Sequence, residues 1–235
     1  AVARDIWSRG RLPILCGGTG FYFRALTRGL FPGPGRQPAL RQRLEYLAER
    51  RGVERLHRLL GRVDRESAVR IQPRDTKRIV RALEVFFVTG RPLSAHFADT
   101  RSPLPEADVL AIALRVPSAL IADRVQRRVD EQFARGLLDE IRALIAGGVP
   151  ETARSFGGLV YRQALDHLHG VRDEAATRAL ITQENRRYAR RQTMWFKKEP
   201  GLQWLDGPGE RESAISAAAA LVEERVARSA QDARA

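Results

Sequence analysis

The sequence has few of the residues that hold small secreted proteins together or bind zinc. It contains one cysteine, Cys16, among 235 residues, which excludes a disulfide framework and a cysteine-based zinc site. No apolar run approaches the ~18 residues that a membrane-spanning helix needs, and the opening residues lack the apolar core of a signal peptide. We therefore expect a cytoplasmic protein with no membrane partner.

Lysine is also scarce, since only three of the 41 basic residues are lysines. A GC-rich genome can exchange lysine for arginine, but this exchange adds no charge. The 28 acidic residues leave a net charge of +13, which indicates a polyanionic partner, with nucleic acid favoured. Cations cluster in residues 74–81 and 186–198. Residues 41–65 are also basic but include several acids, which is typical of a solvated helical face.

Apolar runs and glycines predict an α/β protein. Residues 12–16 (LPILC) form a short apolar run that ends in Gly17-Gly18-Thr19-Gly20, and a helical pattern follows over residues 21–30. Strand, glycine turn and helix together form one unit of a parallel sheet. Residues 107–116 predict a second, buried strand, and residues 201–206 (GLQWLD) a final edge strand. Further helices are predicted over residues 119–135, 137–146, 175–198 and 215–227.

Breaker residues divide the chain. The run Phe31-Pro32-Gly33-Pro34-Gly35 predicts a domain boundary. Helical periodicity over residues 40–60 and 78–89 then predicts an all-helical insertion. The predicted organisation is an α/β core over residues 1–35 and 99–210, the insertion over residues 36–98, and a terminal helix with a frayed tail over residues 211–235.

The glycine turn has two interpretations. It can bring backbone amides and the Thr19 hydroxyl close to a phosphate or a base. It can equally be a tight turn in which Thr19 caps the following helix. The turn is not a P-loop, because no Gly-Lys pair occurs anywhere in the chain, and it is not a G-x-G-x-x-G fingerprint.

A basic stripe follows Pro73. Asp75 is a good N-cap for a helix, and Arg74, Arg78 and Arg81 share one side of that helix, away from its apolar face. This stripe suits the phosphate backbone of a nucleic acid. A solvated face whose arginines pair with nearby acids explains the same pattern nearly as well.

Residues 185–198 (NRRYARRQTMWFKK) give the stronger RNA signal. Arginines recur one helical turn apart, and Tyr188 and Trp195 lie seven residues apart, on one face. Guanidinium and aromatic planes together suit phosphates and unstacked bases. We expect Trp195 in the core and the arginines outside. The four histidines lack ligand spacing, so we assign no protein metal site.

Several segments resemble one family in the same order. LPILCGGTGFYFRAL resembles the PI-x-x-GGTG-x-Y element of the tRNA dimethylallyltransferase (tRNA isopentenyltransferase) family. Four further segments are similar to other sequence elements of this family: VDRESAVRIQPRDTKRIVRALEVFFVTGRPLS, RVQRRVDEQFARGLLDEIRAL, VYRQAL and YARRQTMWF. The resemblance covers residues 12–206. It implies a P-loop-NTPase-like parallel-sheet core with a helical insertion.

The resemblance also implies an activity. Members transfer the dimethylallyl group of dimethylallyl diphosphate to N6 of the adenosine 3′-adjacent to the anticodon of tRNA, with Mg²⁺ as cofactor. Thr19 matches the family's substrate-orienting threonine. The positions that match tRNA-binding residues are Arg41, Lys77, Arg78, Ile79, Val80, Arg81, Tyr161, Arg162, Arg186, Arg190 and Arg191. The expected partners are the anticodon stem-loop and the diphosphate donor, bound by a monomer.

The sequence also departs from the family. Its P-loop and its aspartate general base have no counterpart among these residues. We therefore expect an N-terminally truncated core, residues that precede Ala1, an unknown diphosphate site, and no catalysis by this chain alone. Val160, Asn185 and Met194 replace a glycine and two threonines. The alternatives are an adenylate isopentenyltransferase that acts on free nucleotide, and a non-catalytic RNA-binding fragment.

Overall fold

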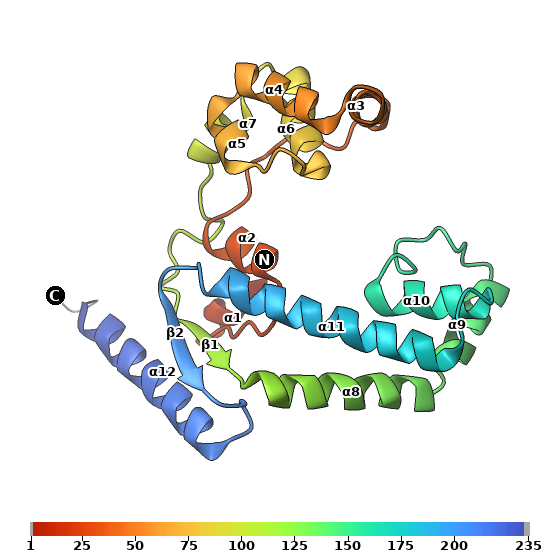
Figure 1. The fold of residues 1–235 in the computed structure, drawn as a ribbon. Coiled ribbons are helices and arrows are strands. Elements are labelled where there is room, and N and C mark those ends of the chain that lie inside the picture. Colours follow the sequence, from red (N-terminus) through yellow and green to blue (C-terminus); the bar gives the residue numbers. More distant parts are fainter. Residues whose placement is uncertain (1, 233–235) are drawn as a thin grey trace. The chain divides into compact units, whose positions relative to one another are not determined.

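The computed structural model describes residues 2–232 and consists mainly of helices (Figure 1). The chain forms two compact units. Unit 1 combines Ala1–Gly20 with Val109–Ala235, and unit 2 comprises Phe21–Asp108. Unit 2 thus contains the predicted insertion, residues 36–98, together with flanking residues on both sides. The end of the predicted frayed tail, residues 233–235, lies outside the described residues.

Unit 1 carries a small sheet and most of the long helices. Its elements are α1 (Val2–Ser8), β1 (Ala111–Arg115), α8 (Ser118–Ala134), α9 (Leu137–Ala146), α10 (Leu159–Leu168), α11 (Glu174–Phe196), β2 (Leu202–Asp206) and α12 (Glu212–Asp232). The predicted helices over 119–135, 137–146 and 175–198 are confirmed to within two residues. The terminal helix is longer than predicted, because α12 continues through residue 232.

The sheet pairs β1 with β2 in parallel, with Ala111 opposite Leu202 and Arg115 opposite Asp206. This confirms a parallel sheet built from distant segments. The strand predicted over residues 12–16 is wrong, since these residues have no regular secondary structure. A strand needs a neighbour that satisfies its backbone N–H and C=O groups, and in the described part of the chain β1 and β2 pair only with each other. β1 is also shorter and more exposed than predicted.

The core of unit 1 lies among its helices rather than beneath the sheet. Buried apolar side chains include Val129, Phe133, Ile141 and Ile181, which come from α8, α9 and α11. Figure 1 shows α11 lying along α8. These contacts fix the position of α11, the helix that contains the arginine- and aromatic-rich segment suited to RNA binding.

Unit 2 is wholly helical within its described residues. Its elements are α2 (Gly20–Thr27, which begins at the last residue of unit 1's first segment), α3 (Pro38–Arg51), α4 (Val53–Val63), α5 (Arg65–Arg70), α6 (Thr76–Thr89) and α7 (Leu93–Ala98). Gly52 adopts φ +82° between α3 and α4, where glycine is the favoured residue. Leu44, Leu56, Leu60 and Leu83 fill the core. Among the described residues, no helix is both long and apolar enough to span a membrane.

Candidate nucleic-acid interface

The glycine turn lies directly on the C-terminal half of α11. The Gln192 side-chain amide donates to the Gly18 carbonyl oxygen at 2.6 Å. A Cβ atom at Gly18 would lie 2.6 Å from Gln192 Nε2, and a Cβ atom at Gly20 would lie 2.4 Å from the Trp195 indole ring. The turn therefore needs glycine at Gly20, where the rigid indole ring lies so close, whereas at Gly18 the end of the flexible Gln192 side chain can shift.

Thr19 stands between these two close contacts and is exposed. Within the described residues we find no hydrogen bond that its hydroxyl oxygen accepts from a backbone N–H of α2. The interpretation of Thr19 as a helix cap lacks the bond that defines a cap. The hydroxyl is instead exposed at the point where the turn rests on α11.

Trp195 and Gln192 are neighbours on one face of α11, three residues apart. Trp195 is half-buried, so the prediction that it belongs to the core is only partly right. Its ring packs against Gly20 and meets Phe196 edge-on, with ring centroids 4.9 Å apart. The aromatic side chain thus supports the turn and is not available for stacking on a base from that side.

The basic side chains of α11 lie on its exposed surface. Arg186, Arg190 and Arg191 are all exposed. The Arg191 guanidinium lies 5.8 Å from the centre of the Tyr188 ring, and Arg186 reaches the Ala122 carbonyl oxygen at 3.4 Å. Arg191 is one helical turn from Trp195. The row of cations therefore begins next to the residue of α11 that packs against Gly20, which follows Thr19.

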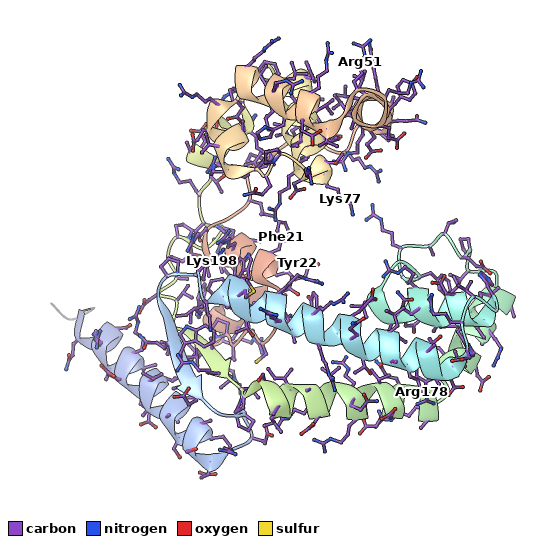
Figure 2. All side chains as sticks on the ribbon, viewed as in Figure 1. Phe21, Tyr22, Arg51, Lys77, Arg178 and Lys198 are labelled. Carbon is purple, nitrogen blue, oxygen red and sulfur yellow. The ribbon has the colours of Figure 1, made fainter. Side chains whose placement is uncertain are left out.

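The predicted basic stripe of α6 is mostly paired with acids. Arg78 Nη1 lies 3.4 Å from Asp75 Oδ2, and Arg74 Nε lies 3.6 Å from Glu54 Oε1. Asp75 also caps α6, because its carboxylate accepts from the Arg78 backbone N–H at 3.1 Å, as predicted. Lys77 is exposed and projects from the start of the helix (Figure 2). The alternative of a solvated, acid-paired face therefore describes this stripe well.

Arg41 and Arg81 meet at Glu84, a buried carboxylate. Glu84 accepts from Arg41 Nη2 at 2.8 Å, from Arg81 Nη1 at 2.7 Å and from the Gln37 backbone N–H at 2.8 Å. Arg81 Nη2 also donates to the Pro34 carbonyl oxygen at 2.9 Å. Burial alone would raise the pKa of Glu84, but the hydrogen bonds from Arg41, Gln37 and Arg81 outweigh it and lower the pKa to about 2.

This cluster changes what the two arginines can do. Arg41 and Arg81 retain 24% and 32% exposure, so only part of each guanidinium can reach an RNA. The hydrogen bond to Glu84 also raises the pKa of Arg41. The cluster fastens the segment that leads into α3 to the middle of α6.

Ile79 and Val80 are core residues. Their side chains are 0% and 1% exposed and pack in the helical core of unit 2. Direct tRNA contact by these two side chains is therefore excluded by their burial, although both belong to the stretch that resembles the family's. The surface of this stretch comes from Lys77 and Arg78.

Tyr161 and Arg162 lie in the first turn of α10 and connect it to its neighbours. The Tyr161 hydroxyl donates to Glu140 Oε1 at 2.5 Å, and this bond, followed by burial, raises the pKa of Tyr161. Arg162 is exposed and lies 3.3 Å from Glu184 on α11. Both side chains thus have internal partners, and Arg162 keeps a solvent-facing side.

Sequence reasoning missed several partners of these residues, namely Glu84 in unit 2, and Glu140, Glu184 and Gln192 in unit 1. Glu84 had one available signal, because it lies three residues after Arg81 on a predicted helix, the spacing of an ion pair. The other three meet partners that are distant in sequence, and no local pattern predicts such contacts.

A protein-held metal ion finds no ligand cluster among residues 2–232, where no three His, Cys, Asp or Glu side chains converge. His57 contacts the backbone instead: its Nε2 lies 2.9 Å from the Ala68 carbonyl oxygen and 3.0 Å from the Ile71 carbonyl oxygen. These residues therefore do not fit a Mg²⁺ ion bound by side chains alone.

Comparison with known proteins gives a consistent result. The family model described as IPP transferase matches residues 1–199. A tRNA dimethylallyltransferase of Geobacter metallireducens is 42% identical over 212 residues, which cover 90% of this chain and 69% of that protein. A tRNA dimethylallyltransferase of Koribacter versatilis is 39% identical over 223 residues, covering 94% and 72%.

The solved structures agree in fold. The crystal structure of the full-length tRNA isopentenylpyrophosphate transferase of Bacillus halodurans is similar to this chain with a TM-score of 0.65 and 28% identity. The similarity covers 99% of this chain and 72% of that one. It supports an α/β core with a helical insertion.

Proposed function

We propose that this chain, which belongs to the IPP transferase family, takes part in the transfer of a dimethylallyl group to tRNA. The relatives that share about 40% of its residues are named tRNA dimethylallyltransferases. The observation that carries the proposal is the exposed Thr19 hydroxyl, which sits on a turn pressed against the arginine-bearing end of α11.

The donor in this proposal is dimethylallyl diphosphate, and the acceptor is N6 of the adenosine that follows the anticodon. N6 attacks the allylic carbon, the carbon–oxygen bond breaks, and diphosphate leaves as N6 loses a proton. Thr19 orients N6 through its hydroxyl. Close positioning and exclusion of water supply much of the rate in such reactions, and the base must leave its stack to reach the donor.

The remaining predicted tRNA-binding residues have unequal parts in the proposal. Lys77, Arg78, Arg190 and Arg191 offer exposed cations to phosphates. Arg41 and Arg81 offer only the part of each side chain that Glu84 leaves free. Tyr161, Arg162 and Arg186 hold internal partners while lying at or near the surface.

Two components of the proposed reaction, a P-loop and a metal site, are not found among the described residues. Residues 1–235 contain no G-x-x-x-x-G-K-[S/T] sequence, and we propose that these residues alone do not complete the transfer. Mg²⁺ remains the proposed cofactor on family grounds, but no step here depends on it. We also propose that the protein acts as a monomer in the cytoplasm, where unmodified tRNA is available.

A free-nucleotide acceptor is the second candidate. An adenylate isopentenyltransferase needs no surface for an anticodon stem, whereas residues 21–108 hold 18 basic and 10 acidic side chains, a surplus of 8 within the chain's +13. This surplus favours RNA, since binding to a polyanion draws on many cations.

The test uses the protein as its gene encodes it, labelled dimethylallyl diphosphate, Mg²⁺, and either unmodified tRNA or adenosine monophosphate. The proposal expects label in the tRNA at the adenosine after the anticodon. Label in the free nucleotide, with none in tRNA, would establish the second candidate instead. Binding of tRNA without label in either acceptor would favour a non-catalytic RNA-binding protein.

A further inference from the structure

Helix α4 carries a row of arginines on its outer side. Arg55, Arg58 and Arg62 are spaced three and four residues apart, so they form one stripe along the helix. All three are exposed. The opposite side of α4 carries Leu56 and Leu60, which are 4% and 0% exposed in the core of unit 2. The core therefore fixes which way the α4 stripe faces.

The α4 stripe differs from the basic stripe of α6 in its partners. Arg74, Arg78 and Arg81 each lie near a carboxylate. In the part of the chain that the structure describes, we find no ion pair or hydrogen bond from the side chains of Arg55, Arg58 or Arg62. Three arginines with no ion pair or hydrogen bond among the described residues thus share one side of α4, where the sequence pattern indicates only a solvated face.

Like charges one turn apart on a helix repel each other. Arg58 and Arg62 have this spacing, and Arg55 adds a third charge. Since the three side chains have no ion pair or hydrogen bond among the described residues, an external anion is the partner that would relieve the repulsion. The surplus of basic residues in unit 2 strengthens the local positive potential.

We propose that the α4 stripe, which shares no residue with the α6 stretch or with α11, binds the phosphate backbone of the substrate RNA. Guanidinium groups match phosphate oxygens in bidentate geometry. At ~1.5 Å per residue the stripe spans about 10 Å along the helix, enough to follow more than one phosphate. Contacts of this kind position an RNA without selecting its sequence.

An anionic membrane is the other polyanion to consider. A helix that binds a membrane surface inserts apolar side chains beside its cations. The apolar side chains of α4 face the core instead, as Leu56 and Leu60 show. The stripe therefore offers charge without an inserting face, which favours RNA.

The test measures tRNA binding against salt concentration for the protein as its gene encodes it. The variant Arg55→Gln/Arg58→Gln/Arg62→Gln should reduce the slope of log K against log salt by about 2 to 3. The matched control, Arg9→Gln/Arg135→Gln/Arg228→Gln, removes the same charge from arginines paired with Asp5, Glu131 and Glu224. It should leave the slope unchanged. A triple arginine-to-lysine variant of the stripe should also keep the slope.

A stripe variant with the unchanged slope, or a control with an equal loss, would overturn the proposal. So would loss of binding to phosphatidylserine vesicles with tRNA binding intact, which would indicate a membrane. The inference rests on the proposed function, and a short RNA duplex without an anticodon loop separates the two. Duplex binding that depends on the stripe supports the inference even if dimethylallyl transfer fails, whereas transfer without stripe-dependent binding contradicts the inference alone.

Discussion

Arg41 and Glu84 form an ion pair that joins the start of α3 to the middle of α6, with 2.8 Å between Arg41 Nη2 and Glu84 Oε2. Arg81 shares the same carboxylate oxygen at 2.7 Å. Two cations that family resemblance assigns to tRNA thus also have a structural partner. Glu84 is 0% exposed, so the carboxylate of this pair lies in the interior of unit 2.

Replacing Glu84 should destabilise the protein. Glu84→Gln leaves two half-buried guanidiniums without a carboxylate, and we expect a loss of roughly 3 kcal/mol in the free energy of unfolding. Urea denaturation measures it. The matched control is Glu66→Gln, which breaks an exposed pair with Arg70 and should cost less than about 1 kcal/mol. Equal losses in the two variants would show that Glu84 is an ordinary surface acid.

The same carboxylate predicts a pH dependence. The pKa of Glu84 is lowered from 4.5 to about 2 in the folded protein, so its ionised form stabilises folding above pH 4.5. This contribution, about 3 kcal/mol at neutral pH, is lost as the pH falls from 4.5 to 2. The difference in unfolding free energy between wild type and Glu84→Gln should therefore shrink over that range. The pKa of Asp64 is also lowered, but Asp64 is present in both proteins, so its contribution cancels in the difference between their unfolding free energies.

The turn contacts predict opposite tolerances at two glycines. A methyl group at Gly20 meets the rigid Trp195 ring, so Gly20→Ala should destabilise unit 1 by about 1–3 kcal/mol. A methyl group at Gly18 meets the end of the flexible Gln192 side chain, so Gly18→Ala should cost no more than about 1 kcal/mol, the worth of one hydrogen bond. Chemical denaturation followed by tryptophan fluorescence compares them. The reverse order would mean that the turn does not rest on α11 as described.

The exposed arginines of α11 predict a salt effect. Arg190→Ala/Arg191→Ala should weaken tRNA binding and reduce its salt slope by up to ~0.7–0.9 for each lost phosphate contact. Weakening should be similar for different tRNA sequences, since phosphates carry no sequence information. If the slope is unchanged, these arginines have internal rather than RNA partners.

Local patterns predicted the helices well. Asp75 before an amphipathic run predicted the start of α6, and the apolar spacing around Gly136 predicted α9 to the residue. The run over residues 12–16 failed as a strand because strand formation depends on a partner that the run itself does not specify. Its Leu12 and Ile14 are exposed, which no composition rule would indicate.

The site was predictable in kind but not in contacts. The order of motifs indicated the family, and Thr19 stood out between glycines. The reason for the glycines came only from the structure, because Gly18 and Gln192 are 174 residues apart. The charge pattern likewise did not show which arginines have internal partners. Arg41 and Arg81 form ion pairs with the buried carboxylate of Glu84. Arg55, Arg58 and Arg62, which have no such partner among the described residues, lie in a stretch whose pattern indicated only a solvated face.

The role of Thr19 is the central claim, and one comparison tests it most directly. In the protein as its gene encodes it, kcat/KM for tRNA and the unfolding free energy are measured for Thr19→Ser and Thr19→Ala. A substrate-orienting hydroxyl predicts that serine keeps most of kcat/KM, while alanine loses about tenfold or more with little change in stability. An alanine variant that is destabilised by ~1 kcal/mol, the effect of a lost helix cap, but keeps its kcat/KM would contradict the account.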